Sequence, residues 1–459
     1  MSSDSADPTA FSPTPRVIPR DQHNLSRKQI SRGALKVLYT LKDAGFRGCL
    51  VGGAVRDLLL GRKPKDFDVA TDATPEEVRK LFRNCRLIGR RFRLAHVIFG
   101  PEIVEVATFR GTGDGEDSED HHVVDGRIVR DNVWGTIEED AVRRDFRVNA
   151  LYYDIADFSV LDFVGGIEDL ERKELRLIGD PVTRYHEDPV RMLRAARLAA
   201  KLGFTIDPAA AAPFRDCGAL LAEAPPARLF DECQKMFLAG YGLASFRKLL
   251  ECGLLRQLFP GAVRALANDA SGALRTLMEQ GFAGTDARVA EGRPVTPAFL
   301  FAVLLWGEVE PLARQLHAEG VPPSLAWQRA GHRVMADAGK RVSIPHRFGY
   351  AIEEIWALQP RFAERTRKRV FRLLAHPRFR AAYDFLLLRA GESDAVRGSG
   401  EWWTRAQTLA PEELSALLAP RTAAKPGDTT DAKPAGTRRR HRRGGGRRKK
   451  AAATPETPE

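Results

Sequence analysis

The chain has 459 residues, 43% of them hydrophobic, which is enough for about three domains with their own cores. Its net charge of +12 and pI of about 9.6 favour a polyanionic partner such as nucleic acid, although a merely basic protein would carry the same charge. Five scattered cysteines without a C-x-x-C pair argue against a disulfide framework or a structural zinc site and fit a reducing cytoplasm. No stretch has the roughly 18 apolar residues that would predict a transmembrane segment.

The first part of the chain mixes predicted strands and helices. Residues 1–25 are rich in Ser, Pro and Asp and predict a disordered leader without the layout of a secretory signal. The pattern then predicts, in chain order, a helix over 34–45, a strand at Cys49–Val51, a helix from Val55 to Leu60, a strand over Asp66–Ala70, a helix starting at Thr74-Pro75, strands over His96–Phe99 and Ile103–Thr108, a mobile acidic loop over Gly111–Asp125 and a helix from Ile137.

The second part of the chain is almost wholly helical in its pattern, from about residue 180 onward. Its last segment, 421–459, has twelve Lys and Arg against four Asp and Glu, so its net charge of +8 is most of the total. The sequence therefore predicts an α+β fold. The expected regions are a head with a small mixed sheet over 26–180, a helical neck over 181–265, a helical body over 266–415 and a disordered basic tail over 416–459.

A glycine turn and two acids form the most informative motif. Gly52 and Gly53 allow a backbone to approach phosphate closely, and Arg56 adds a bidentate donor. Asp66 and Asp68 are two positions apart on the predicted strand, so both carboxylates are expected on one face. The turn could instead be structural with Arg56 in a surface ion pair, and the acids could lie on a solvated face. Their closeness in sequence favours an enzyme that binds a nucleoside triphosphate.

Divalent metal is the expected ligand of the acid pair. Mg²⁺ takes oxygen ligands and shares them with substrate phosphates, and two such ions can assist nucleotidyl transfer. Glu105, on a neighbouring predicted strand, is a weaker candidate for a third carboxylate, because an outward position on an alternating strand explains it equally well.

A second motif places Arg143 and Arg144 beside Asp145. Arginine binds phosphate bidentately, and aspartate can accept hydrogen bonds from ribose hydroxyls. A local ion-pair cluster at a helix end is the alternative. However, Arg147 makes a third arginine within five residues, and these charges repel one another unless an anion is close.

A third motif starts a predicted helix over Pro189–Leu202 that ends at Gly203. Helix capping alone would account for Asp188. It does not account for Arg191 and Arg194, because cations in the first turns oppose the helix dipole. We therefore expect an anionic or hydrogen-bonding ligand, with Asp188 and Arg191 suited to the edge of a base.

These motifs, in this order, resemble those of class II nucleotidyltransferases, the family of bacterial poly(A) polymerases and CCA-adding enzymes. The matching segments are Gly52–Asp57, Asp66–Asp68, Arg143–Phe146, Glu187–Arg191 and Pro226–Glu232. Within the family, the segments Leu81–His96 and His376–Asp384 and the arginine-rich tail are most similar to the poly(A) polymerase I subfamily. The pair Arg147-Val148 departs from the family pattern, which more often has a Thr-Ile-like pair there.

The resemblance implies roles for these residues. Asp66 and Asp68 would bind catalytic Mg²⁺, with Mn²⁺ as a substitute, and Asp145 would be a further catalytic acid at the ribose. The implied nucleotide-binding residues are Gly52, Gly53, Arg56, Arg143, Arg144, Asp188, Arg191 and Arg194. The expected reaction is template-independent addition of AMP from ATP to an RNA 3′ end, with release of pyrophosphate.

The basic tail and the helical body, 266–415, are expected to bind the RNA backbone without reading its sequence. The tail could also hold RNA-decay or RNA-chaperone proteins. A disordered solubilising segment is the simpler alternative. The tail residues in question are Arg438, Arg439, Arg440, Arg442, Arg443, Arg447, Arg448, Lys449 and Lys450. Two other functions remain open, a CCA-adding enzyme that uses CTP and ATP on tRNA and an inactive RNA-binding protein on the same scaffold.

Overall fold

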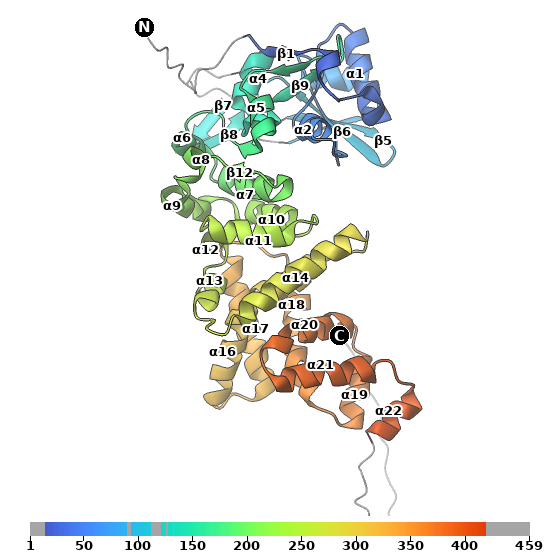
Figure 1. Ribbon diagram of the computed structural model, residues 1–459, viewed down its shortest axis with the longest axis vertical. Coiled ribbons are helices and arrows are strands. Elements are labelled where there is room, and N and C mark those ends of the chain that lie inside the picture. The colour runs from blue at the N-terminus through green and yellow to red at the C-terminus, as the bar shows by residue number, and fades with distance from the viewer. Residues whose placement is uncertain (1–13, 90–92, 112–120, 125–126, 132, 419–459) are drawn as a thin grey trace, which may run out of the picture.

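The structure is a computed structural model that describes residues 14–89, 93–111, 121–124, 127–131 and 133–418, with side chains left out of the description between 112 and 132. The molecule is elongated, with a sheet-bearing head at one end and helices filling the rest (Figure 1). This arrangement confirms the predicted α+β class. No helix among the described residues is long and apolar enough to cross a membrane.

The head is built on one eight-stranded sheet in the order β1-β10-β9-β2-β3-β6-β5-β4, in which the pairs are antiparallel except for the parallel pair β3–β6. The strands are β1 (Arg16–Ile18), β2 (Gly48–Val51), β3 (Asp68–Thr71), β4 (Cys85–Ile88), β5 (Leu94–Phe99), β6 (Glu102–Thr108), β9 (Leu151–Asp154) and β10 (Val160–Asp162). The head helices are α1 (Arg32–Asp43), α2 (Gly53–Leu59), α3 (Pro75–Leu81), α4 (Ile137–Arg143) and α5 (Gly166–Arg172).

Alternate residues of the central strands feed two different cores. Leu50 of β2 and Val69 of β3 join the main core, which includes Leu38 of α1. Cys49 and Ala70, one position away on the same strands, join a smaller core on the other face with α4. The sheet is therefore covered on both sides, and its strand ends are left to carry the polar site.

Local sequence sets the helix ends of the head. Thr74 caps α3 and Glu77 bonds back to the Thr74 backbone, which is a capping box with Pro75 at the first position. Gly52 takes a positive φ of 70°, which turns the chain sharply from β2 into α2. The predicted helices and strands on either side of this turn are confirmed to within a few residues.

Beyond the head the chain is helical. The neck contains α6 (Pro181–Glu187), α7 (Val190–Leu202), α8 (Pro208–Ala211), α9 (Phe214–Cys217), α10 (Pro226–Phe237), α11 (Gly242–Glu251), α12 (Leu255–Leu258) and α13 (Pro260–Ala267). The body contains α14 (Ala273–Ala290), α15 (Pro297–Leu304), α16 (Trp306–Ala318), α17 (Pro323–Gly339), α18 (His346–Leu358), α19 (Arg367–Leu374), α20 (Phe379–Leu388), α21 (Asp394–Ala406) and α22 (Pro411–Leu417).

Two cores hold these helices together. The main core runs from the head through the neck and into the body as far as Trp356 and Phe385. A second, smaller core lies among the last helices and includes Phe362, Val370 and Trp403. Helices α19 and α21 therefore belong to a small unit of their own at the far end of the molecule (Figure 1).

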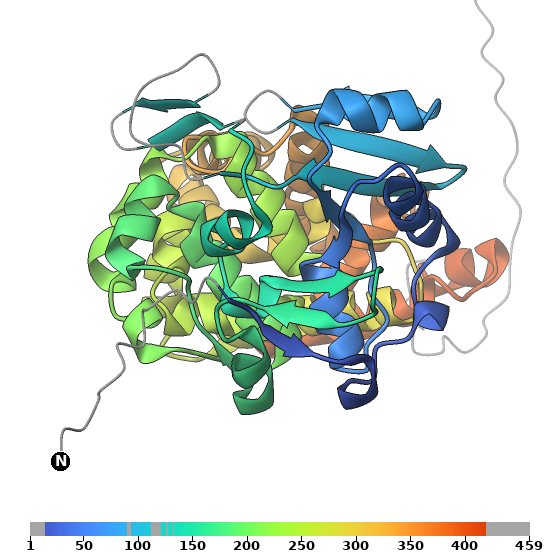
Figure 2. The same cartoon turned by 90° about the horizontal axis from the view of Figure 1, so that it is seen from above.

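Two predictions about strands were wrong. The segment Gly111–Asp125, predicted as a loop, contains β7 (His121–Val124), which pairs with β8 (Arg127–Asp131) in a separate hairpin. Seen from above, this hairpin lies to one side of the main sheet (Figure 2). The predicted disordered leader, 1–25, contains β1, which pairs with β10 at the edge of the main sheet. The prediction of an almost wholly helical region after residue 180 is confirmed, with β12 (Thr205–Ile206), which pairs with β11 (Glu174–Leu175), as the exception among the described residues.

Candidate active site

The two acids of the first motif lie at the start of β3. The strand begins at Asp68, not at Asp66 as predicted. The alternation of side chains along a strand therefore does not explain why the two carboxylates face the same cavity. Asp66 lies in the preceding connection, its side chain 71% exposed and 4.0 Å from Lys65. Both aspartates nevertheless line one cavity, and the charge of Asp66 acts on Asp68.

This cavity, of about 880 Å³, opens between head and neck. Its wall carries eight Lys and Arg side chains against four Asp, which makes it suited to a polyanion such as a triphosphate. The lining residues with polar side chains are Arg56, Asp57, Arg62, Lys63, Lys65, Asp66, Asp68, Asn149, Arg194, Arg197, Lys201, Asp231, Gln234, Lys235 and Tyr241.

Asp68 is in an unusual electrostatic setting. Burial, together with the charges of Glu105 and Asp66, raises the pKa of Asp68 to about 6. A carboxylate that is both desolvated and crowded by other carboxylates is stabilised by a bound cation, so this donor set fits a hard divalent metal. Across the described residues, no group of three or more His, Cys, Asp and Glu is placed to hold a metal ion.

Glu105 lies beside Asp68, but its carboxylate lies next to His96. The parallel pairing of β3 with β6 sets Asp68 opposite Glu105. Glu105 is half exposed and its Oε1 is 3.3 Å from Nε2 of His96. With Asp68 it lines a second cavity of about 230 Å³. Asp68 therefore stands between the two cavities, whereas Glu105 reaches only the smaller one.

The glycine turn brings Arg56 to the same cavity. Arg56 is buried on α2, and its Nε donates to Oδ1 of Asp57 at 2.8 Å. Its Nη1 donates to Oδ1 of Asn149 at 2.5 Å. A Cβ on Gly53 would lie 3.3 Å from the Arg56 guanidinium, so a side chain there would crowd that group. Gly53 and Arg56 line the cavity, and Gly52 supplies the turn.

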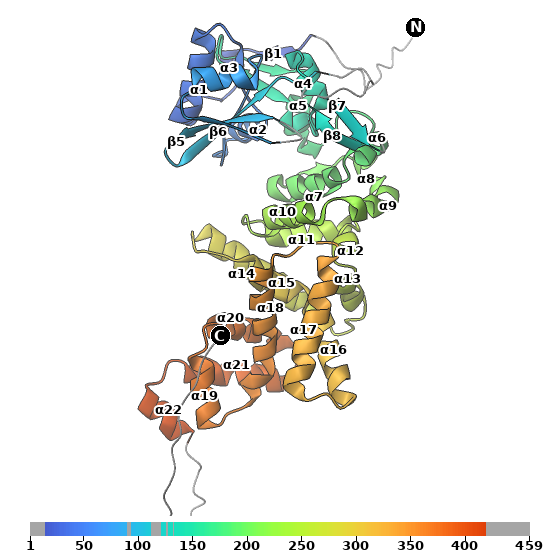
Figure 3. The same ribbon diagram turned by 180° about the vertical axis from the view of Figure 1, so that it is seen from behind.

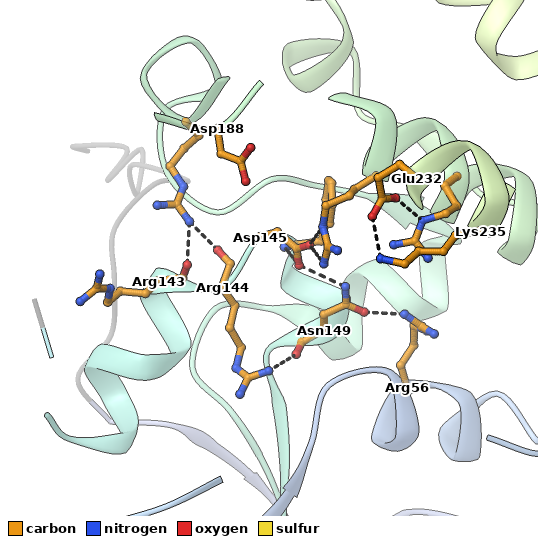
Figure 4. Close-up of polar contacts among 12 residues, drawn as sticks. Arg56, Arg143, Arg144, Asp145, Asn149, Asp188, Glu232 and Lys235 are labelled. Atoms are coloured by element: carbon orange, nitrogen blue, oxygen red, sulfur yellow. Dashed lines mark hydrogen bonds and ion pairs between the residues drawn. The ribbon is translucent and has the colours of Figure 1, made fainter. Parts of the chain in front are cut away.

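Four hydrogen bonds hold the carboxylate of Asp145 in place. Its Oδ2 accepts from Nε and Nη2 of Arg194 at 2.8 and 2.5 Å, and its Oδ1 accepts from the Phe146 backbone and from Asn149. Burial alone would raise the pKa of Asp145, but Arg194 and these hydrogen bonds hold it well below its ordinary value. The resulting chain from Arg56 through Asn149 to Asp145 lies within the head (Figure 4), and the bonds of Asp145 to Arg194 on α7 join it to the neck.

The paired arginines of the second motif are not in this cavity. Arg144 is bound by Asp140 and Tyr152 in the head, at 2.9 and 2.8 Å, and lines the smaller cavity with Arg143. Nucleotide binding by Arg143 and Arg144 stays a prediction, and the structure places both residues at the smaller cavity. The carbonyl oxygens of both arginines accept from Nη2 of Arg184, another tie between head and neck (Figure 4).

The third motif is held by ion pairs that its sequence did not reveal. Both oxygens of Asp188 accept from Arg228 on α10 at 2.7 Å, and Asp188 Oδ1 also accepts from the Val190 backbone at 3.2 Å. Nη1 of Arg191 donates to Glu187 at 2.7 Å. Glu187 therefore offsets the charge of Arg191 without a bound anion, and the role of Arg191 in ligand binding stays a prediction.

Several residues of the site were missed from the sequence. Asn149 and Arg228 link motifs that lie far apart along the chain, and Lys201 donates to the buried Asp57 at 2.9 Å. Arg228 could have been found from the sequence, because it lies in the matching segment Pro226–Glu232, but no sequence feature indicated that its partner is Asp188.

The predicted tail residues 438–450 lie outside the described residues. Trp403 is fully buried, with its indole N–H donating to the Phe362 carbonyl.

Comparisons with family models place most of this chain in one family. A Poly A polymerase head domain model matches residues 49–176, and a model described as a probable RNA and SrmB-binding site of polymerase A matches 203–266. A model of the polymerase A arginine-rich C-terminus matches 319–448. The first of these contains the Asp66, Asp68 and Asp145 positions.

The chain is also similar to solved structures of CCA-adding enzymes. That of the Bacillus stearothermophilus CCA-adding enzyme in complex with CTP covers 84% of this chain and 80% of its own, with a TM-score of 0.52 and 26% identity. That of the Thermotoga maritima CCA-adding enzyme complexed with tRNA covers 84% of both, with a TM-score of 0.57 and 20% identity, and shows the shared fold.

Curated relatives that are poly(A) polymerases I match more of this chain than a CCA-adding enzyme does. The CCA-adding enzyme of Lactobacillus helveticus is 38% identical over 48% of this chain and 53% of its own length. Poly(A) polymerase I of Haemophilus influenzae is 43% identical over 88% of this chain and 90% of its own. That of Escherichia coli O6:H1 is 50% identical over 88% and 89%. The chain belongs to the poly(A) polymerase I family of nucleotidyltransferases.

Proposed function

We propose that this protein adds AMP from ATP to RNA 3′ ends without a template and releases pyrophosphate. The observation that supports this best is the opening of Asp66 and Asp68 onto a cavity with twice as many cationic as anionic side chains. A triphosphate needs such a wall, and nucleotidyl transfer needs carboxylates beside it. The similarity to poly(A) polymerase I over most of the chain favours this reaction over CCA addition.

Asp66 and Asp68 would hold Mg²⁺, with Mn²⁺ as a substitute. When bound at two positions beside the acids, the metal would supply Lewis-acid chemistry, lowering the pKa of the RNA 3′ hydroxyl and offsetting charge on the leaving pyrophosphate. Asp66 and Asp68 line one cavity and Asp68 lies opposite Glu105, so a cation there would relieve the repulsion among neighbouring carboxylates.

The protein's own side chains would bind and orient the substrates. Arg56 and the cationic wall of the cavity would hold the triphosphate, with Gly53 letting it approach the backbone. Asp145, kept ionised by Arg194, would accept a hydrogen bond from a ribose hydroxyl. Asp188, with Arg191 nearby on α7, would present acceptor and donor groups to the base.

Compartment and partners belong to the same proposal. All five cysteines are free, which fits a reducing cytoplasm. The basic segment after residue 420 would bind RNA through its phosphates, so affinity should fall steeply with salt. RNA-decay or RNA-chaperone proteins are the partners we propose for the same segment.

An extension assay with radiolabelled nucleotides tests the reaction. The protein is incubated with several unrelated RNAs and with either ATP or CTP, and products are separated by length. Long products from ATP alone on many RNAs are expected. Products that stop after CCA on tRNA would replace the proposal with the CCA-adding reaction, and no incorporation would indicate an RNA-binding protein that has lost catalysis.

A further inference from the structure

One surface of the body carries a dense positive charge that no part of the active site uses. Residues 361–380 contain eight Lys and Arg and a single acid, Glu364. All eight cationic side chains are exposed. The segment covers the end of one helical unit, α19 and the start of α20, so the charge is gathered on a folded surface.

Three of these cations are neutralised by neighbouring acids. Arg369 lies 3.1 Å from Glu364, Arg378 lies 3.2 Å from Glu354, and Arg380 lies 3.0 Å from Asp384. The other five have no ion-paired partner in the part of the chain that the structure describes. We call these five the α19 basic patch, which consists of Arg361, Arg365, Arg367, Lys368 and Arg372.

Three residues of the patch, Arg367, Lys368 and Arg372, lie on the amphipathic helix α19, and Arg361 and Arg365 precede it. Val370 and Leu373 of α19 are buried in the small C-terminal core, so the core fixes which way the helix faces. Arg367 and Lys368 then fall in the first turn with no acid in that turn and no side-chain cap. Cations at that end oppose the helix dipole, so this charge costs stability in the isolated protein.

An aromatic ring borders the patch. The guanidinium of Arg365 lies over the ring of Trp402 on α21, 5.0 Å from its centroid. Trp402 is partly buried, unlike its neighbour Trp403. Cations beside an aromatic surface are the combination found where proteins bind single-stranded nucleic acid without sequence preference.

The patch lies on the same side of the molecule as part of the head sheet. In two opposite views, α19 and the free end of α14 lie on the same side of the long axis as β5 and β6 of the head (Figures 1 and 3). Helices α16 and α17 lie on the other side in both views. β6 pairs with β3, the strand that begins with Asp68, so the patch shares a side with the catalytic part of the head.

We propose that the α19 basic patch binds the phosphodiester backbone of the RNA substrate upstream of its 3′ end. This rests on the proposed function, because it assigns a place to that substrate. Binding at a second point far from the cavity would hold the growing RNA by phosphates alone, independently of sequence. An acidic protein partner is the other class of ligand such a surface could take, and the experiment below separates the two.

Two double variants of the full chain test this. Arg367→Ala/Lys368→Ala removes two charges from the patch. Arg329→Ala/Arg333→Ala removes two exposed charges from α17, on the opposite side, and is the matched control. The probe is fluorescently labelled oligouridylate in a series of increasing length, with affinity measured by anisotropy without ATP at several salt concentrations.

The patch variant is expected to bind long oligouridylate about tenfold more weakly than the control. The slope of log affinity against log salt should fall by about 1.4, since each phosphate contact to a single strand contributes about 0.7. For the shortest oligomers, which cannot reach from the cavity to the patch, the affinity ratio of the two variants should be near one. Thermal melting of both variants should match that of the unmodified protein.

Equal affinities of the two variants for long RNA would overturn the proposal and leave a protein partner as the ligand of the patch. A loss of the same size on the shortest oligomers would also overturn it, because the effect would then arise at the cavity. Since no ATP is present, the result stands apart from catalysis. Failure of the extension assay would refute the proposed function without touching this comparison.

Discussion

The head–neck cavity and the α19 basic patch are both rich in arginine, yet they hold it in opposite ways. In the cavity, Arg56 is buried and bound by Asp57, and Arg194 is bound by Asp145 through two hydrogen bonds. In the patch, Arg367 and Arg372 are exposed and have no ion-paired partner among the described residues. The same side chain is fixed in one region and loose in the other.

The difference indicates two kinds of recognition. A guanidinium held by a carboxylate keeps its position before substrate arrives, so it can set the geometry of a reacting group. A loose cation on the surface gives little orientation, but it attracts any phosphate within a Debye length. We therefore expect substitutions in the cavity to change catalysis and stability, and substitutions in the patch to change RNA affinity and its salt dependence.

Asp68→Asn should have the largest effect. It removes the charge that opens onto the cavity while keeping the shape of the side chain, so we expect kcat to fall by at least about 1,000-fold. Asp66→Ala should also abolish tailing. RNA affinity should stay nearly unchanged in both variants, because the patch is untouched. Extension assays and anisotropy on the same preparations measure the two quantities.

Glu105→Gln is the matched control for Asp68→Asn. It removes one negative charge next to Asp68 from a half-exposed side chain that does not line the larger cavity. It should lower kcat far less than Asp68→Asn does. Substantial tailing by the Asp68 or Asp66 variant would refute the assignment of the metal to this pair.

Asp169→Asn tests a buried carboxylate of the head that accepts no hydrogen bond. The other buried carboxylates there accept hydrogen bonds, and these are Asp57, Asp140, Asp154 and Asp162. Neither oxygen of Asp169 does, although Arg176 lies 3.5 Å away. Burial outweighs the charges of Arg147 and Arg176 and raises the pKa of Asp169 to about 7.

The sign of its effect on stability follows from that shift. The folded protein holds a proton on Asp169 between about pH 4 and pH 7 that the unfolded chain has released, so stability falls as pH rises through this window. At pH 8, Asp169→Asn should stabilise the protein by up to about 4 kcal/mol, at about 1.4 kcal/mol per pKa unit. Urea unfolding at pH 5 and pH 8 measures it, and a destabilised variant at pH 8 would show that Arg147 and Arg176 make the charge favourable.

Arg194→Ala should combine both kinds of loss. It leaves the Asp145 carboxylate without its guanidinium in a nearly buried position, which costs about 3 kcal/mol of folding free energy. Tailing should fall as well, because Asp145 would keep only the two hydrogen bonds to its Oδ1 and would bind a proton more readily. Denaturant unfolding and kcat/KM measure the two losses. Arg194→Lys keeps the charge but not the fork, so it should lie between the variant and the unmodified protein.

Arg367→Ala in the patch is the matching substitution for Arg194→Ala. It should change the unfolding free energy by less than about 0.5 kcal/mol, since exposed positions without partners contribute little. If the two variants lost similar stability, the contrast between held and loose arginines would be wrong.

The sequence predicted those parts of the fold that depend on local interactions. Thr74 and Pro75 start α3, and Gly203, at a φ of 71°, ends α7, because caps and glycine conformation act within one turn. The acid pair was also placed at the correct end of β3, although Asp66 lies outside the strand. The hairpin β7–β8 was missed, because its acidic and glycine-rich flank matches a loop pattern.

The sequence could not predict the partners of the charged residues. Arg228 lies 40 positions from Asp188, and Arg194 lies 49 positions from Asp145. Such pairs exist only after distant parts of the chain have packed together, and no local pattern encodes them. Arg144 is held by closer partners, Asp140 four positions and Tyr152 eight positions away, which the sequence analysis did not assign to it.

Among the catalytic substitutions of charged partners near the cavity, Arg228→Ala should lower activity least. It tests whether the orientation of the Asp188 carboxylate sets the preference for ATP over CTP. Without Arg228 the Asp188 carboxylate loses two hydrogen bonds and can rotate. We expect about a tenfold loss of kcat/KM for ATP with a smaller loss for CTP, because truncating one partner of a charged hydrogen bond costs roughly 1.5 to 3 kcal/mol at most. Single-nucleotide extension with each triphosphate measures the ratio. Equal losses for both would mean that Arg228 supports the fold rather than base selection.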